Sequence, residues 1–248
     1  MSLRPASLLL LLFAGCASQT AIPAGVRSAI DRQHHGQVVE LRQSCYYGDL
    51  YDDNDKWLLS PQPFAQVHHI VDLDGQPIHP KNQRGLVRAG TRFVIDEIEF
   101  PDSFAVTTRM LTTPRYNIWV YLHPVDERAR LPTERSRWVL LLPRDLPDGA
   151  AVERELSARL APEGKMRRWL DGRRPTVRVA IEHKDILAGM NVDELVAAMG
   201  EPPLWIENER MNGSRAKVAW YGRREAWLVG GTVVAVEPGR DATAPASP

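Results

Sequence analysis

The chain has 248 residues, of which 44% are hydrophobic and 25% charged, the composition of an ordinary globular protein. Lysine plus arginine and aspartate plus glutamate both number 31, so the formal net charge is zero. A chain without net charge has no long-range attraction to nucleic acid or to anionic lipid. We therefore expect no nucleic-acid partner. The length is sufficient for one large domain or two small ones.

The first sixteen residues have the pattern of a secretory signal. Arg4 precedes a short apolar run over residues 8–13, and Ala14, Gly15 and Cys16 follow. The run is too short to cross a hydrocarbon core of about 30 Å as a helix, which favours a cleaved signal over a transmembrane anchor. It also resembles the bacterial lipoprotein signal. That resemblance implies cleavage between Gly15 and Cys16, a signal peptide over residues 1–15, and attachment of the membrane lipid to Cys16.

The resemblance also implies a location in the cell envelope, anchored by lipid and facing the periplasm. Ala17 stands where inner-membrane lipoproteins of enterobacteria typically carry aspartate, which favours the outer membrane. Residues 16–35 are predicted to be a tether, with a short helix over residues 24–34. If Cys16 is acylated, Cys45 has no partner within the chain, and we expect it to be a buried small hydrophobe.

Residues 36–145 have the pattern of a β-rich region. Short apolar and β-branched runs are separated by glycine- and proline-rich breaks, which predicts a small antiparallel barrel or sandwich. The expected strands cover residues 37–42, 66–72, 91–100, 104–110, 117–123 and 137–142. Residues 88–95 are weakly similar to bacterial SH3-like domains, in which a glycine turn leads into a strand. Residues 48–56 are expected to be a solvated acidic loop.

The periodicity changes to that of a helix over residues 148–160. Val152, Leu156 and Leu160 recur every four residues, and Asp148 is a suitable N-cap. Pro162 favours an end to this helix. We interpret residues 146–175 as a helical connector between two folded regions.

The C-terminal region begins with a second helix signal. Asn191 is a good N-cap, and Glu194 three residues later completes a capping box. Gly200 is expected to end the helix in the left-handed conformation, and Pro202 prevents continuation. Apolar strands separated by Asn212-Gly213 and by a Gly-Gly pair then predict an antiparallel meander. The fold class is therefore α+β.

Residues 176–237 resemble the BamE/SmpA/OmlA-like lipoprotein family. Members of that family carry a Gly-Met-Thr/Ser helix start, a Leu-Gly pair eight residues on, and then a proline. The matching residues here are Gly189, Met190, Gly200 and Pro202. Asn191 replaces the hydroxyl residue and Met199 the leucine. The resemblance implies a helix-plus-meander domain and a role in assembly at the outer membrane. Residues 238–248 have the composition of a disordered tail.

Catalytic and metal-binding patterns are missing from the sequence. Four aspartates between residues 49 and 55 lack the glycine and the final glutamate of an EF-hand loop. The seven histidines show no zinc-ligand spacing, and no nucleophile motif or phosphate-binding loop occurs. We expect no enzyme activity, no cofactor and no metal.

Aromatic residues provide the best candidate binding surface. Tyr51 and Trp57 flank the acidic stretch, and Arg115 and Tyr116 belong to a second aromatic-rich stretch. These residues either pack in the core and along strand edges or, where exposed, form a recognition surface, since exposed tyrosine, tryptophan and arginine are common interface anchors. The sequence therefore predicts a non-catalytic scaffold or assembly factor that contacts an envelope protein. The alternative is binding of cell-wall glycan or of a small ligand, or an unrecognised envelope enzyme, in the β-rich half.

Overall fold

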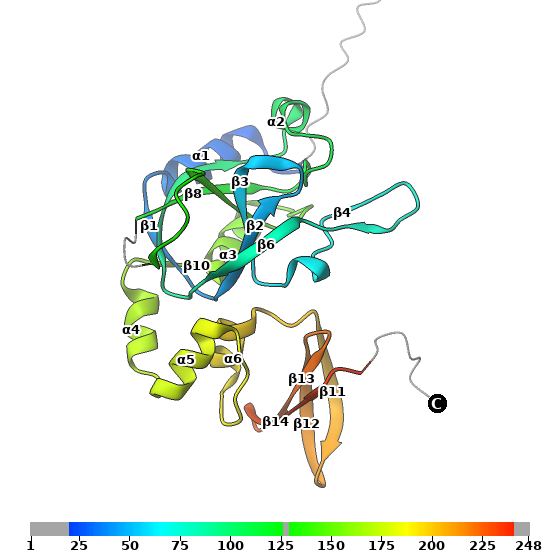
Figure 1. Cartoon of the computed structure of the whole chain (residues 1–248). Helices are drawn as coiled ribbons and strands as arrows, with labels where there is room; N and C mark the ends of the chain where they lie inside the picture. The colour runs from blue at the N-terminus through cyan, green and yellow to red at the C-terminus, as the bar shows by residue number, and fades with distance from the viewer. Residues whose placement is uncertain (1–19, 126–128, 241–248) are drawn as a thin grey trace, which may run out of the picture.

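The computed structural model describes residues 20–125 and 129–240. The expected signal peptide, Gly15 and Cys16 lie outside the described residues, as do residues 241–248 of the expected tail. Within the described part, the chain forms two lobes, each with its own sheet (Figure 1). The mixed α+β class predicted from the sequence is confirmed.

The first lobe contains an open sheet of eight strands in the order β10-β1-β7-β8-β9-β3-β2-β6. In chain order the strands are β1 (Val38–Leu41), β2 (Cys45–Leu50), β3 (Asp53–Ser60), β6 (Lys81–Val87), β7 (Arg92–Glu99), β8 (Trp119–Pro124), β9 (Arg137–Leu141) and β10 (Leu160–Pro162). The sheet does not close into the small barrel that was one of the two expected arrangements, and it is not wholly antiparallel. The edge strands β10 and β6 do not pair, and β3 and β9 are parallel because a long crossover separates them.

Two helices cover one face of this sheet, α1 (Ala24–His34) and α3 (Gly149–Arg159). Asp148 caps α3 as predicted, and its carboxylate accepts a hydrogen bond from the Ala151 amide. The expected tether over residues 16–35 is wrong for its second half, since Ile22 and Ile30 are buried in the core with Val152. Burial of Ile30 on α1, and of Ile22 just before the helix, makes this segment part of the fold.

The other face of the sheet carries a second apolar cluster, beside the short helix η1 (Phe64–Gln66) and the small hairpin β4 (Ile70–Val71) and β5 (Pro77–Ile78). The strand expected over residues 66–72 is therefore reduced to two residues. The strand expected over residues 104–110 is the helix α2 (Ser103–Thr108). The Asp102 carboxylate accepts hydrogen bonds from the Phe104 and Ala105 amides, and this cap starts a helix where the apolar pattern alone favours a strand.

The second lobe packs α4 (Lys165–Asp171), α5 (Pro175–His183) and α6 (Val192–Met199) against a four-stranded antiparallel meander. Its strands follow in chain order: β11 (Leu204–Met211), β12 (Ser214–Trp220), β13 (Arg224–Val229) and β14 (Thr232–Pro238). The predicted capping box is present, with the Asn191 side chain and the Glu194 side chain each bonded to the other's backbone amide. Asn212 and Gly213 both have positive φ, as a tight hairpin turn requires.

Two expectations for the C-terminal region need correction. Gly200 has φ +87° and ψ 177°, which is an extended conformation of positive φ and not the left-handed helical cap. The position predicted for the start of the tail, residue 238, is too early. Pro238 ends β14, and Arg240 makes ion pairs with Glu225 at 2.8 Å and Glu209 at 2.9 Å.

Candidate functional site

The two lobes meet at a seam of buried hydrogen bonds around Ser44. Its amide donates to the Ala197 carbonyl at 3.0 Å and its hydroxyl donates to the Ile181 carbonyl at 2.6 Å. The same hydroxyl accepts from the Ala89 amide at 3.0 Å. The Ser44 hydroxyl of the first lobe is therefore bonded to α5, and the Ser44 backbone amide is bonded to α6.

Lys184 reinforces this seam from the second lobe. Its buried ammonium donates to the Ser44 carbonyl at 2.7 Å and to the Ala198 carbonyl at 2.8 Å, and it lies 5.3 Å from the ring centre of Tyr46. Desolvation lowers the pKa of Lys184 to about 8. The group is still charged at pH 7, so it fixes the C-terminal end of α6 to the first lobe.

Glu40 makes the third contact between the lobes. This fully buried carboxylate on β1 accepts hydrogen bonds from the Met166 amide at 2.7 Å and the Arg167 amide at 3.2 Å. The free amides at the start of a helix attract negative charge, so Glu40 holds the N-terminus of α4. With α4 and α6 both fixed, the space between them has a defined width.

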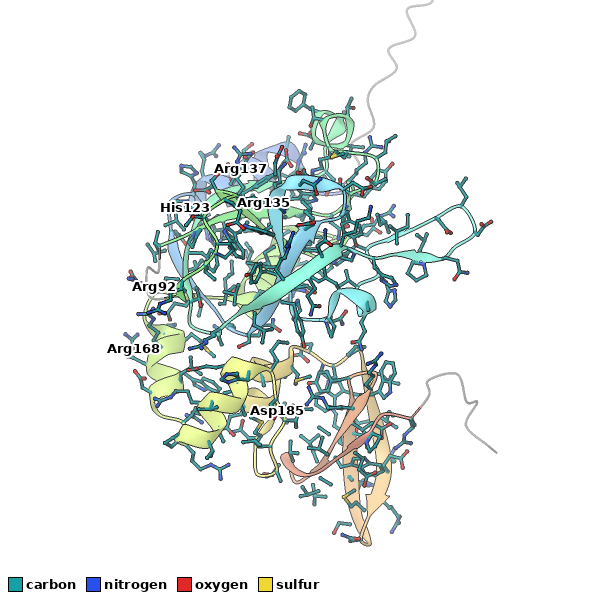
Figure 2. The ribbon with its side chains drawn as sticks, viewed as in Figure 1. Arg92, His123, Arg135, Arg137, Arg168 and Asp185 are labelled. Carbon is teal, nitrogen blue, oxygen red and sulfur yellow. The ribbon has the colours of Figure 1, made fainter. Side chains whose placement is uncertain are left out.

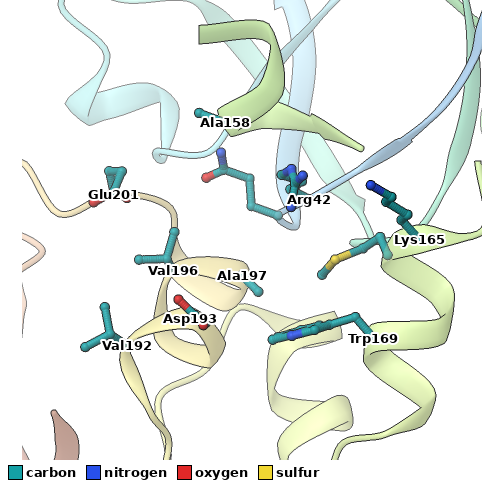
Figure 3. A pocket seen from close by; sticks show the side chains of 11 residues that line it. Arg42, Ala158, Lys165, Trp169, Val192, Asp193, Val196, Ala197 and Glu201 are labelled. Carbon is teal, nitrogen blue, oxygen red and sulfur yellow. The ribbon is translucent and has the colours of Figure 1, made fainter. Parts of the chain in front are cut away.

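That space is a cavity of about 450 Å³, open to solvent, between the first lobe and helices α4 and α6 (Figure 3). Eleven residues line it: Arg42, Gln43, Ala158, Lys165, Met166, Trp169, Val192, Asp193, Val196, Ala197 and Glu201. We call it the interlobe groove.

Apolar side chains from α4 and α6 form the floor of the interlobe groove. Trp169 projects from α4 toward α6, where Val192 and Val196 face the same space (Figure 3). The Arg173 guanidinium lies 4.8 Å from the centre of the indole ring and pairs with Glu194 at 3.5 Å. Arg173 therefore holds the ring in place, and it does so through the capping-box glutamate predicted from the sequence.

Charged side chains of opposite sign stand on the two rims of the groove. Lys165 lies on the α4 side, beside Arg42, and Asp193 and Glu201 lie on the α6 side (Figure 3). Within the described part of the chain, Lys165, Asp193 and Glu201 have no ion-pair partner. The groove thus offers an apolar floor between an unpaired cation and unpaired anions.

The lining residues are suited to binding. They include no hydroxyl, thiol or imidazole group, and their ionisable groups are the side chains of Arg42, Lys165, Asp193 and Glu201. Among the described residues, no cluster of three or more histidine, cysteine, aspartate or glutamate side chains could hold a metal ion. No helix in residues 20–125 or 129–240 is long and apolar enough to span a membrane.

The predicted aromatic surface is only partly present. Tyr51 is 1% exposed and Trp57 2%, so neither can serve as an exposed anchor, and the expectation for both is wrong. Arg135, labelled in Figure 2, lies 3.8 Å from the ring centre of Trp57 and pairs with Asp49 at 2.9 Å. Asp49 and Asp53 are buried in β2 and β3, so the expected solvated acidic loop is also wrong.

The other predicted residues have different roles. Tyr116 is 37% exposed, and it follows Arg115 in the loop after α2. Met190 and Pro202 are buried, and with the Asn191 cap they position α6 beside the groove. Cys45 is free and buried as predicted, and burial raises its pKa to about 11.

Sequence reasoning did not find the groove. Trp169 and Lys165 lie in the stretch interpreted as a connector, and their helix is only seven residues long. A tryptophan among four arginines between residues 167 and 174 was the available signal. That signal does not predict a groove, because the groove exists only where α6 lies opposite α4.

Comparisons with protein-family models, with curated proteins and with solved structures found no match to this chain.

Proposed function

We propose that this protein is a lipid-anchored scaffold of the cell envelope that holds a polypeptide segment of a partner protein in the interlobe groove. Its anchor is Cys16, and the body faces the periplasm, with the outer membrane favoured. The proposal involves no catalysis. The observation that carries it is the interlobe groove itself, which has a volume of about 450 Å³, an apolar floor and charged side chains of both signs on its rims.

A polypeptide segment fits this combination of features. Trp169, Val192 and Val196 offer apolar surface, and tryptophan is a frequent anchor of protein interfaces. Lys165 opposite Asp193 provides charge complementarity, which sets the orientation of a bound segment. The two cations and two anions of the rims balance, so the groove has no net attraction for a nucleic acid or a purely acidic ligand.

The proposal keeps the family resemblance of the second lobe. A capped helix followed by an antiparallel meander supports a BamE-like domain and a role in assembling envelope proteins. For the first lobe, the strands around Gly90 are the support for an SH3-like relationship.

The anchor can be tested by metabolic labelling with a fatty-acid analogue. We expect the wild-type protein to take up label and Cys16→Ala to take up none, because the thioether requires the Cys16 sulfur. The buried Cys45 provides the matched control, since Cys45→Ala should leave the label unchanged. Undiminished label in Cys16→Ala would contradict the anchor.

The groove can be tested by photo-crosslinking in intact membranes. A crosslinking side chain at Val196, inside the groove, should give a discrete protein adduct. The same side chain at Val179, exposed on α5 outside the lining set, should not. Lys165→Glu should weaken the Val196 adduct about tenfold or more, since a wrong charge at an interface rim costs on the order of 1–2 kcal/mol or more. Arg154→Glu, a matched reversal on α3, should leave it unchanged.

Two results would overturn this function. The first is identical adducts from Val196 and Val179. The second is co-sedimentation with purified peptidoglycan, together with indifference of the Val196 adduct to Lys165→Glu. That second outcome would favour the alternative of cell-wall glycan binding.

A further inference from the structure

Three exposed apolar side chains lie within residues 104–111, on α2 and at the start of the loop that follows it. Phe104 is 76% exposed, Leu111 is 81% exposed, and Met110 is also exposed. Tyr116 lies at the end of the same loop. Phenylalanine, leucine and methionine normally gain about 1.5–3 kcal/mol each from burial, so a group of them in water indicates a surface that something covers. We call Phe104, Met110, Leu111 and Tyr116 the apolar knob.

The apolar knob is held rigidly to the sheet. The buried Arg109 guanidinium donates to the Glu99 carboxylate at 2.6 Å and 2.9 Å, and to the carbonyls of Arg115 at 2.7 Å and Asn117 at 2.8 Å. It also lies 4.3 Å from the ring centre of Trp119. These hydrogen bonds fix the backbone of the loop in one conformation, and that conformation leaves the apolar side chains in solvent. Their exposure is thus a feature of the folded state and not the result of a loose loop.

The knob lies beside the start of the folded chain. Arg27 on α1 pairs with Asp102, the N-cap of α2, at 3.5 Å. Ala24 at the start of α1 and Phe104 line the same cavity of about 330 Å³. Ile22 is buried in the core and Cys16 is six positions before it, a span of at most about 22 Å. A lipid on Cys16 would therefore keep this end of the molecule close to the bilayer.

We infer that the apolar knob inserts into the membrane surface beside the lipid anchor. The inference rests on the proposed acylation of Cys16. Aromatic and aliphatic side chains on a rigid projection bind the boundary between headgroups and acyl chains, and a second contact adds to the hold of one lipid anchor. Because α2 is at the opposite end of the molecule from β11–β14, insertion directs the second lobe away from the bilayer (Figure 1).

Charges around the knob indicate which lipids it can enter. Arg144 lies 4.9 Å from the ring centre of Tyr116, and Asp102 and Asp145 are exposed nearby in the chain. Both signs are present, so attraction to anionic lipid contributes little. Insertion is therefore expected in zwitterionic phosphatidylcholine and should be insensitive to salt.

The depth of the knob can be measured on the acylated full-length protein in phosphatidylcholine vesicles. Met110→Cys is labelled with a polarity-sensitive fluorophore; Cys45 does not compete, because it is buried. We expect quenching of this label by nitroxide on the lipid acyl chains. A label at Val236→Cys on β14 should remain unquenched. Adding Phe104→Ser and Leu111→Ser should lower the quenching about twofold or more. Val71→Ser with Leu73→Ser, which removes two exposed apolar side chains from the β4–β5 hairpin, should not.

Each of the other outcomes overturns the inference in a distinguishable way. If the protein does not float with the vesicles, the anchor fails and the insertion fails with it. If the protein floats but the Met110→Cys label stays unquenched, the anchor stands and the insertion is wrong. If the label is unquenched and the sedimentation mass halves with Phe104→Ser and Leu111→Ser, a second copy of the chain covers the knob instead.

Discussion

The substitution Gly200→Val is expected to lower the free energy of unfolding by about 2–5 kcal/mol. A residue with a Cβ atom in the extended region of positive φ costs about 1–3 kcal/mol, and crowding adds a similar amount. The added Cβ would stand 2.7 Å from the Gln43 side-chain oxygen and 2.8 Å from the Pro61 Cβ, and both belong to the other lobe. Thermal or denaturant unfolding of the purified protein measures the change.

Gly231→Val is the matched control for that experiment. Gly231 has φ +78°, close to the value at Gly200, but a Cβ atom there meets nothing within 4 Å. We expect Gly231→Val to show the backbone penalty alone and to be milder than Gly200→Val. Equal effects would mean that the close contact between the lobes at Gly200 does not contribute.

The substitution Arg109→Met is expected to destabilise the region around α2 by about 3–5 kcal/mol. Removing one partner of a buried ion pair leaves the other charge uncompensated. Here the carbonyls of Arg115 and Asn117 would lose the Arg109 donor, and the Glu99 carboxylate would lose its cation and keep only the bond from the Tyr121 hydroxyl. Limited proteolysis between residues 103 and 116, together with denaturant unfolding, reports the loss.

Two further variants separate the causes of that loss. Arg144→Met removes an exposed arginine that also lies over an aromatic ring, and its effect should stay within about 0.5 kcal/mol. Arg109→Lys keeps the charge but not the planar fork of donors, so it should still be clearly destabilising. Full stability of Arg109→Met would contradict the role of Arg109 in holding the knob.

Local physical chemistry made several elements predictable. The Asp148 cap and the four-residue spacing of Val152 and Leu156 located α3. The reciprocal bonds of Asn191 and Glu194 located the start of α6, and Asn212-Gly213 located the first hairpin of the meander. In each case, the bonds that define the element join residues that are close in sequence.

The errors occurred where distant residues decide the outcome. Tyr51 and Trp57 flank an acidic stretch, but pairing of β2 with β3 buries them, and Arg135, more than 75 residues away, covers Trp57. The error over residues 104–110 has a local cause instead, because the Asp102 cap starts the helix α2 (Ser103–Thr108) where the apolar pattern alone favours a strand. The apolar pattern of residues 104–110 therefore does not predict that Phe104 is exposed.

Short-range patterns were sufficient to predict the α+β class, the capped helices α3 and α6 and the Asn212-Gly213 turn, and to propose the lipid site at Cys16. Long-range packing is what keeps the first sheet open and creates the interlobe groove and the apolar knob. The groove requires Glu40 to hold α4, and Ser44 and Lys184 to hold α6, from positions up to 140 residues apart. The knob requires Arg109 to fix a loop. Such contacts are made by packing, and no local pattern of residues encodes them.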